Sequence, residues 1–383
     1  MLNRRRLLQF GGAGAASLGF GLGLPTIAFA ATARTDKRFL FVIQRGAADG
    51  LATLAPTGDP AYAGLRGDLA ADVAGGAKLD AMFTLHPGMV ETAKLYAAKQ
   101  ALFVQAVASP YRDRSHFDGQ NVLESGGAGA YRVKDGWLNR LLTELPGGKA
   151  VALAPTVPLA LRGSAPVQSY APSNLPQAGD DLLIRIGELY AQDAQLGPLW
   201  TQAQAARMKA GELGDAKGGA AAGQLAAKLM SGADGARIAM IETNGWDTHN
   251  GQRGRLAAQL RGLDALVANL KAGLGADWSN TFVLVATEFG RTAKANGTGG
   301  TDHGTGAMAM LIGGAVAGGK VIADWPGLGP SALYEGRDLK PTINLDALIA
   351  SALSQHFGLD GARTAALLFP ETRPGLLGQR LVA

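Results

Sequence analysis

Short apolar segments that alternate with helical patterns constrain the fold of this chain more than any other feature. They are Arg38–Gln44, Leu102–Val107, Arg237–Glu242, Thr281–Ala286 and Ala307–Ile312. Brief apolar runs of this kind, bounded by turn residues, are typical of buried strands. Between the third and fourth segments, apolar residues recur every three or four positions, as on the buried face of an amphipathic helix. They are Leu256, Leu260, Leu263, Val267 and Leu270.

This alternation predicts the architecture. Strands that are separated by helices pair in parallel through βαβ units, and the helices then cover both faces of the sheet. We therefore predict an α/β fold, a three-layer sandwich with a mostly parallel central sheet. With 47% hydrophobic and 17% charged residues in 383 positions, the composition suits a large buried core and excludes a disordered chain.

Residues 1–30 have the pattern of an export signal. Arg4–Arg6 precede an apolar, glycine-rich run, and Ala28–Ala30 ends it with the small residues of a cleavage site. Consecutive arginines followed by Leu7 resemble a twin-arginine signal, which implies the twin-arginine export machinery as a partner. An uncleaved membrane anchor is the alternative.

Residues 31–383 form the predicted mature protein, a single α/β domain with a loop-rich insertion around residues 131–235. No later stretch reaches the roughly 18 apolar residues of a membrane span, so we expect no stable span after cleavage. Without the three arginines of residues 1–30, the chain keeps 33 Lys and Arg residues against 31 Asp and Glu residues. No basic cluster marks a surface that would bind nucleic acid. We expect a periplasmic or secreted protein. The absence of cysteine excludes disulfides, thiolate metal sites and a cysteine nucleophile.

Acidic and histidine side chains gather near the ends of the predicted strands. They are Asp49 after the first strand, Asp247 and His249 after the third, Glu288 after the fourth, and Asp302 and His303 before the last. Topology brings such groups together, because the carboxyl ends of parallel strands meet at one edge of a sheet. The sequence thus predicts a divalent metal centre, and hydrogen-bonded turns are the alternative. Imidazole and carboxylate ligands favour zinc, whereas calcium, magnesium or manganese would suit a site dominated by oxygen.

A candidate nucleophile follows the second predicted strand. Ser115 lies at the start of a predicted helix, where free N–H groups and the macrodipole favour an anion. A hydroxyl near a metal ion can lose its proton and attack a phosphorus or sulfur centre. Arg114 and Arg291 would then neutralise the transferring group. A plain helix N-cap is the alternative for Ser115.

Six motifs together resemble the domain-of-unknown-function 1501 family. They are RGAADGL (45–51), DRSHFDGQNVLESG (113–126), NGWDTH (244–249), TEFGR (287–291), NGTGGTDHG (296–304) and GGKVIADWPGL (318–328). That family consists of exported bacterial proteins that are grouped with the alkaline phosphatase and sulfatase superfamily. The resemblance covers nearly all of the mature chain and implies an alkaline-phosphatase-like fold.

The resemblance also implies roles for individual residues. Those that match the superfamily pattern are Asp49 as a metal ligand at the end of the first strand, Ser115 as the nucleophile, Asp247 and His249 as a ligand pair, and His303 as the final metal histidine. The chain departs from the pattern after the next strand. Where the superfamily usually has Asp-His, this sequence has Glu288-Phe289, so one histidine ligand is missing and Asp302 or His116 would replace it.

Together, the residues and the resemblance predict a function. The leading hypothesis is an exported metal-dependent hydrolase whose substrate is a small anionic molecule, a phosphate or sulfate ester. The missing histidine motivates the alternative, a non-catalytic metal-binding or assembly protein that keeps the hydrolase fold.

Overall fold

The computed structural model describes residues 35–171, 180–210 and 218–383. The leader predicted over residues 1–30 lies outside the described residues. Within the described ranges, no helix has both the length and the hydropathy that a membrane crossing requires.

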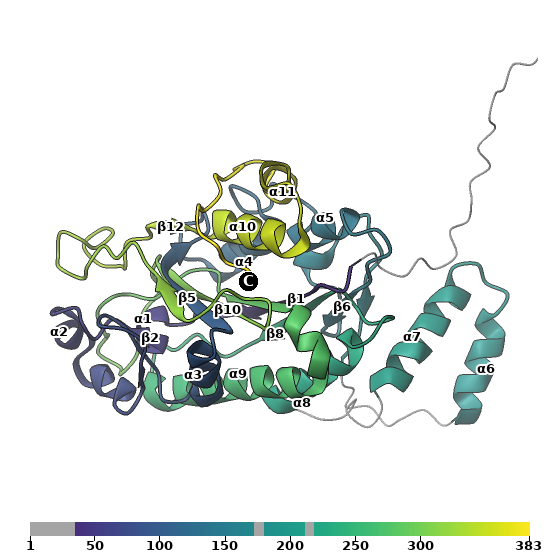
Figure 1. The fold of residues 1–383 in the computed structure, drawn as a ribbon, viewed down its shortest axis with the longest axis horizontal. Helices are drawn as coiled ribbons and strands as arrows, with labels where there is room; N and C mark the ends of the chain where they lie inside the picture. The colour runs from purple at the N-terminus through teal and green to yellow at the C-terminus, as the bar shows by residue number, and fades with distance from the viewer. Residues whose placement is uncertain (1–34, 172–179, 211–217) are drawn as a thin grey trace, which may run out of the picture. The chain divides into compact units, whose positions relative to one another are not determined.

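A nine-stranded sheet forms the core of the fold (Figure 1). Its strands are β1 (Arg38–Gln44), β5 (Ala101–Ala108), β6 (Ala150–Leu153), β7 (Gln168–Ser169), β8 (Ile238–Thr243), β9 (Thr281–Ala286), β10 (Ala307–Ile312), β11 (Lys320–Ile322) and β12 (Ile343–Asn344). They lie in the order β11-β5-β10-β9-β1-β8-β6-β7, and β12 pairs with β5. All the strands predicted from the apolar segments are present, with ends that shift by at most one residue.

Helices cover both faces of this sheet, which confirms the predicted three-layer α/β sandwich (Figure 1). One face packs against α4 (His116–Ser125), α5 (Trp137–Thr143), α10 (Leu345–Phe357) and α11 (Gly361–Leu368). The other face packs against α3 (Val90–Ala97), α8 (Gly218–Met230) and α9 (Gln252–Leu274). Side chains alternate along a strand, so β1 sends Phe39 and Phe41 to the first layer and Leu40 and Val42 to the second. Every residue of β1 is therefore buried.

Strand β10 runs antiparallel to both of its neighbours, β5 and β9. The pairings of β1 with β8 and β9 are parallel, as expected for a mostly parallel sheet. No helix lies between β9 and β10, so the connecting loop turns the chain back without a crossover. Because of this reversal, β10 begins at the edge where β1, β8 and β9 end. The loop before β10 therefore delivers its side chains to that same edge.

Apart from α3, the chain between β1 and β5 forms a smaller unit beside the main sheet. Its elements are α1 (Gly50–Thr53), β2 (Leu54–Ala55), α2 (Tyr62–Arg66), the 3-10 helix η2 (Gly67–Val73), β3 (Ala77–Lys78) and β4 (Thr84–Leu85). The three short strands pair in the order β2-β4-β3. This unit supplies Arg66, a buried arginine beside the carboxyl edge of the main sheet.

Residues 131–235, predicted as a loop-rich insertion, include α5, β6, β7 and α8 together with α6 (Asp180–Tyr190) and α7 (Leu196–Ala210). Helix α8 packs closely against α9 because its glycines admit the partner's backbone. A Cβ atom added at Gly219 would lie 1.8 Å from the Gly262 carbonyl oxygen, and one at Gly223 would lie 2.2 Å from that of Leu266. Gly219 and Gly223 therefore allow α8 and α9 to pack closely.

Candidate metal centre

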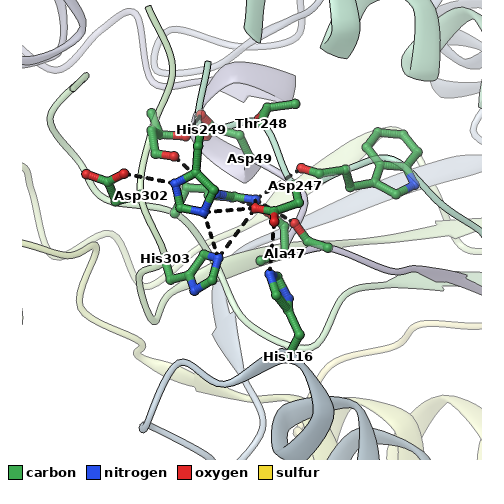
Figure 2. Close-up of polar contacts among 12 residues, drawn as sticks. Ala47, Asp49, His116, Asp247, Thr248, His249, Asp302 and His303 are labelled. Carbon is green, nitrogen blue, oxygen red and sulfur yellow. Dashed lines mark hydrogen bonds and ion pairs between the residues drawn. The ribbon is translucent and has the colours of Figure 1, made fainter. Parts of the chain in front are cut away.

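Histidine and aspartate side chains meet where β1, β8 and β9 end and β10 begins (Figure 2). His116 is the first residue of α4, Asp247 and His249 lie between β8 and α9, and His303 lies in the loop before β10. One ligand atom each from His116, Asp247 and His303 lies within 4.8 Å of the other two. His249 joins them, since its Nε2 atom is 2.9 Å from Nε2 of His303. We call these four residues the His–Asp cluster.

Asp247 lies between the three rings (Figure 2). Its Oδ2 atom is 3.5 Å from His116 Nε2. Its Oδ1 atom is 3.1 Å from His249 Nε2 and 3.4 Å from His303 Nε2. Burial raises the pKa of Asp247, but the hydrogen bond and charge of Arg291 outweigh it and hold that pKa below its usual value. Asp247 is therefore a carboxylate at neutral pH, and its 43% exposed side chain is open to solvent.

Each ring of the cluster is anchored through its Nδ1 atom. The anchoring oxygens are Glu288 Oε1 at 2.8 Å for His116, Asp302 Oδ1 at 2.9 Å for His249, and the Arg114 carbonyl at 3.0 Å for His303. A carboxylate or carbonyl oxygen only accepts hydrogen bonds, so Nδ1 must carry the proton in each ring. A ring in its neutral form then presents the Nε2 lone pair to the cluster. The hydrogen bond to Glu288 raises the pKa of His116, and burial lowers the pKa of His303.

This arrangement of lone pairs fits a bound cation. The Nε2 atoms of His249 and His303 are 2.9 Å apart and repel each other when neither carries a proton. His116 Nε2 is buried and has no hydrogen-bond partner among the described residues. Its 3.5 Å separation from Asp247 exceeds the usual ~2.7–3.2 Å of an N–H···O bond, so a proton there would not satisfy it. Three imidazole nitrogens and one carboxylate are a donor set that zinc accepts.

Two of the predicted ligands contact the Nδ1 atoms of cluster histidines, on the side away from Asp247: Glu288 contacts His116, and Asp302 contacts His249. Glu288 is buried, and it accepts hydrogen bonds from Gly46 N–H and Gln120 Nε2, each at 2.9 Å, as well as from His116. Asp302 is half exposed and contacts His249. Carboxylates in these positions fix the tautomer and orientation of a metal-binding histidine. The structure therefore favours an orienting role for both, and their role as ligands stays a prediction.

Asp49 lies at the same edge but outside the His–Asp cluster. It caps α1 by accepting from Ala52 N–H at 3.0 Å. Arg66 donates to its two oxygens at 2.5 and 3.1 Å, and Gln252 Nε2 donates at 2.7 Å. Burial raises the pKa of Asp49, but the charge and hydrogen bonds of Arg66 hold it below its usual value. The carboxylate is thus charged and already satisfied by protein donors.

The two arginines predicted to neutralise a substrate are both engaged elsewhere. Arg291 is buried, and it donates to the carbonyls of Gly46 and Ala47 at 2.7 Å and of Thr301 at 3.0 Å, as well as to Asp247. Its guanidinium therefore joins the loops that carry the cluster.

Arg114 turns its guanidinium in another direction. Its Nε atom is 2.9 Å from Asp338 Oδ2, and its Nη2 atom is 2.5 Å from Glu335 Oε2. The sequence motifs do not single out Asp338 or Glu335, because both lie in a turn that follows none of the predicted strands and their partner is distant in the chain.

Ser115 precedes His116 at the amino end of α4. Its backbone has the extended conformation of an N-cap, with φ −93° and ψ 125°, but its side chain makes no capping hydrogen bond. Its N–H group donates to the hydroxyl of Tyr111 at 3.0 Å. The Ser115 hydroxyl is thus not used for capping, although its backbone is in the capping position.

The fold and the cluster together define a three-layer α/β protein with a candidate metal centre at the carboxyl edge of its sheet. The family described as "Protein of unknown function (DUF1501)" matches residues 36–368. The chain belongs to this family. No curated protein matches the sequence.

Several solved structures are similar in fold at low identity. Ps i-CgsB, solved in complex with k-i-k-neocarrahexaose, is 11% identical with a TM-score of 0.43, over 89% of this chain and 74% of that chain. The periplasmic domain of EcEptC from Escherichia coli, solved in complex with Zn, is 10% identical with a TM-score of 0.39, over 91% and 92%. Phosphonate monoester hydrolase of Agrobacterium radiobacter is 12% identical with a TM-score of 0.33, over 85% and 74%.

Proposed function

We propose that this protein binds one divalent metal ion, with zinc favoured, and hydrolyses phosphate or sulfate esters at that centre. The observation that carries the proposal is the convergence of three Nε2 lone pairs on Asp247, with every Nδ1 atom committed to an oxygen. The ligands would be His116, His249, His303 and Asp247. The satisfied carboxylate of Asp49 supports a single ion rather than two.

The residues around the cluster suit an anionic substrate. A bound metal ion would act as a Lewis acid on an ester oxygen and lower the pKa of a nearby hydroxyl. Ser115 offers the candidate nucleophile, since its hydroxyl makes no capping bond. The amino end of α4 also starts here, and helix N-termini stabilise phosphate and sulfate groups through free N–H groups. The half-exposed Asp247 and His249 leave room for approach from solvent.

A second candidate function rests on the number of donors. Four protein ligands complete the tetrahedral set that is typical of structural zinc, whereas catalytic zinc usually keeps one position open. A protein that uses all four would bind metal without turnover. This is the non-catalytic metal-binding or assembly protein predicted as the alternative.

Metal analysis combined with an ester panel tests both functions. We expect about one metal ion per purified chain, and hydrolysis of p-nitrophenyl phosphate or sulfate that chelation abolishes. Asp247→Ala should lose metal and activity together, while Ser115→Ala should keep metal and lose activity. Asp234→Ala, at a 93% exposed carboxylate, is the matched control.

The outcomes separate the candidates. Stoichiometric metal without hydrolysis of any ester supports the second function and contradicts the first. A metal-free protein whose Asp247→Ala variant behaves like the wild type contradicts both. Activity that survives in Ser115→Ala would remove the serine from the mechanism and leave the metal centre.

We also propose export by the twin-arginine route, from the pattern of residues 1–30. The double variant Arg5→Lys with Arg6→Lys should stay inside the cell, because the signal depends on consecutive arginines. Cell fractionation measures this, and unchanged export of the double variant would contradict the route.

A further inference from the structure

The anchor of His303 differs in kind from the other two anchors of the cluster. His116 and His249 each bind a side-chain carboxylate, whereas His303 Nδ1 lies 3.0 Å from the backbone carbonyl of Arg114. The direction of a backbone carbonyl is set by the dihedral angles of its own residue. The orientation of the His303 ring therefore depends on the conformation at Arg114.

That conformation is an uncommon one. Arg114 has φ 61°, in the left-handed region that residues with a Cβ atom adopt at a cost. Contacts elsewhere in the protein must offset the cost of this positive φ at Arg114. Its guanidinium is bound by Asp338 Oδ2, at 2.9 Å from Nε and 2.8 Å from Nη2, and by Glu335 at 2.5 Å. The Asp338 side chain is fully buried, whereas that of Glu335 is 57% exposed.

Both acids belong to one tight turn, Tyr334–Asp338. Its ends are joined by two backbone hydrogen bonds, Tyr334 N–H to Asp338 O at 2.9 Å and Asp338 N–H to Tyr334 O at 3.0 Å. The turn also contacts the loop that carries His303 and the neighbouring residue Thr292. Arg337 donates to the His303 carbonyl, and Asp338 forms a bridge with Thr292. The turn therefore contacts both His303 itself and Thr292, whose neighbour Arg291 forms a bridge with His303.

We propose that the Tyr334–Asp338 turn sets the orientation and tautomer of His303, with Asp338 acting through Arg114. Asp338 holds the guanidinium, the guanidinium holds the left-handed backbone, and the backbone carbonyl accepts the Nδ1 proton. The Nε2 lone pair then faces Asp247. Arg114 and Asp338 are positioning residues in this arrangement. The importance of this orientation for metal rests on the proposed function, but the orientation itself can be measured without metal.

Three variants separate the side chain from the backbone. Arg114→Ala removes the guanidinium and leaves a residue that disfavours φ 61°. Arg114→Gly removes the same side chain but adopts positive φ freely. Asp338→Asn keeps the arginine and weakens its anchor. Arg363→Ala is the matched control, since it deletes an arginine of α11 from a largely exposed ion pair with Glu144.

The first readout is the His303 tautomer in the metal-free protein, from long-range ¹H–¹⁵N NMR spectra. The wild type should show the Nδ1–H form, and Arg114→Ala and Asp338→Asn should shift His303 toward a mixture. The second readout is zinc affinity by chelator competition. Arg114→Ala should lose about 10–100-fold, the usual effect of a lost outer partner, and Arg114→Gly should lose clearly less.

The result can overturn the inference in two ways. A His303 tautomer that stays purely Nδ1–H in Arg114→Ala, Arg114→Gly and Asp338→Asn would refute it. Equal loss in the alanine and glycine variants would refute the role of the backbone. If the wild type binds no zinc, the proposed function fails, and the tautomer measurement alone decides the inference.

Discussion

Two aspartates at the same edge of the sheet, Asp49 and Asp247, have opposite surroundings. Both follow a buried strand, and both contact an arginine. Asp49 is enclosed by donors, with Arg66, Gln252 and Ala52 all pointing hydrogen atoms at it. Asp247 faces three histidine nitrogens whose lone pairs need a donor of their own. The comparison indicates where a cation would fit: beside Asp247, where the protein supplies three histidine nitrogens, and not beside Asp49, where it supplies donors.

The largest effect should come from breaking the Asp49 pair. Asp49→Ala leaves Arg66 buried and unpaired, which should cost about 3–5 kcal/mol of unfolding free energy. Metal content should remain as in the wild type, because Asp49 lies outside the cluster. Urea denaturation and elemental analysis measure the two quantities. The double variant Asp49→Leu with Arg66→Met should recover much of the stability, and loss of metal from a folded Asp49→Ala protein would contradict the comparison.

Removal of metal by a chelator should lower the melting temperature through the Asp247 site and not through the Asp49 pair. Metal that binds the native state at 100 times its dissociation constant stabilises by about 2.7 kcal/mol, so EDTA should lower the Tm of the wild type. Asp247→Ala should show no such response, since it lacks the central ligand. Differential scanning fluorimetry with and without EDTA measures this. An equal Tm shift in both proteins would place the metal elsewhere.

A smaller effect on zinc affinity is expected from the carboxylates that contact the cluster histidines, Glu288 and Asp302. Glu288→Gln keeps the shape of the anchor but removes its charge, so zinc affinity should fall by about tenfold, the lower end of the usual range. Asp302→Asn should cost less, because Asp302 is half exposed and solvent can replace it. Chelator competition measures both variants. An unchanged affinity in Glu288→Gln would show that His116 needs no charged anchor.

The smallest effect is an expected absence of pH dependence. The pKa of Asp49 is held below its ordinary 3.8, so the Asp49–Arg66 pair contributes fully above that pH and is lost only as the pH falls through the folded value. The stability difference between wild type and Asp49→Asn should therefore be constant from pH 8 to pH 5. It should narrow only below about pH 3.8. Denaturation curves across this range measure it, and a difference that already narrows at pH 6 would mean that Asp49 is not charged as described.

Much of the fold could be predicted because its signals are local. The apolar runs ending at Gln44 and Ala286 mark buried strands by composition alone, and the spacing of Leu256 and Leu260 marks a helix. The antiparallel direction of β10 is not a local property. It depends on the path of the loop before it, and no residue in Ala307–Ile312 records that path.

The structure brings Asp247, His249 and His303 together, as their positions near strand ends predict, and leaves Asp49 outside the cluster. Residue type and strand position were enough to select Asp247, His249 and His303. The same reasoning could not tell a ligand from its orienting partner, because Glu288 and Asp302 are carboxylates at equivalent strand ends. Only the contacts in the structure distinguish them, because Glu288 and Asp302 face the Nδ1 atoms of His116 and His249 rather than their Nε2 atoms. Asp338 carried no signal at all, since its partner Arg114 is distant in sequence.

The antiparallel β10 also bears on when the centre can exist during biogenesis. The residues of the His–Asp cluster come from the chain after β5, after β8 and before β10, segments that are far apart in the sequence and meet at one edge of the folded sheet. No fragment of the nascent polypeptide holds them together, so an ion cannot nucleate folding as it does in a zinc finger. If the cluster binds an ion as proposed, loading would follow assembly, and the compartment in which the fold is completed would determine which ion is available.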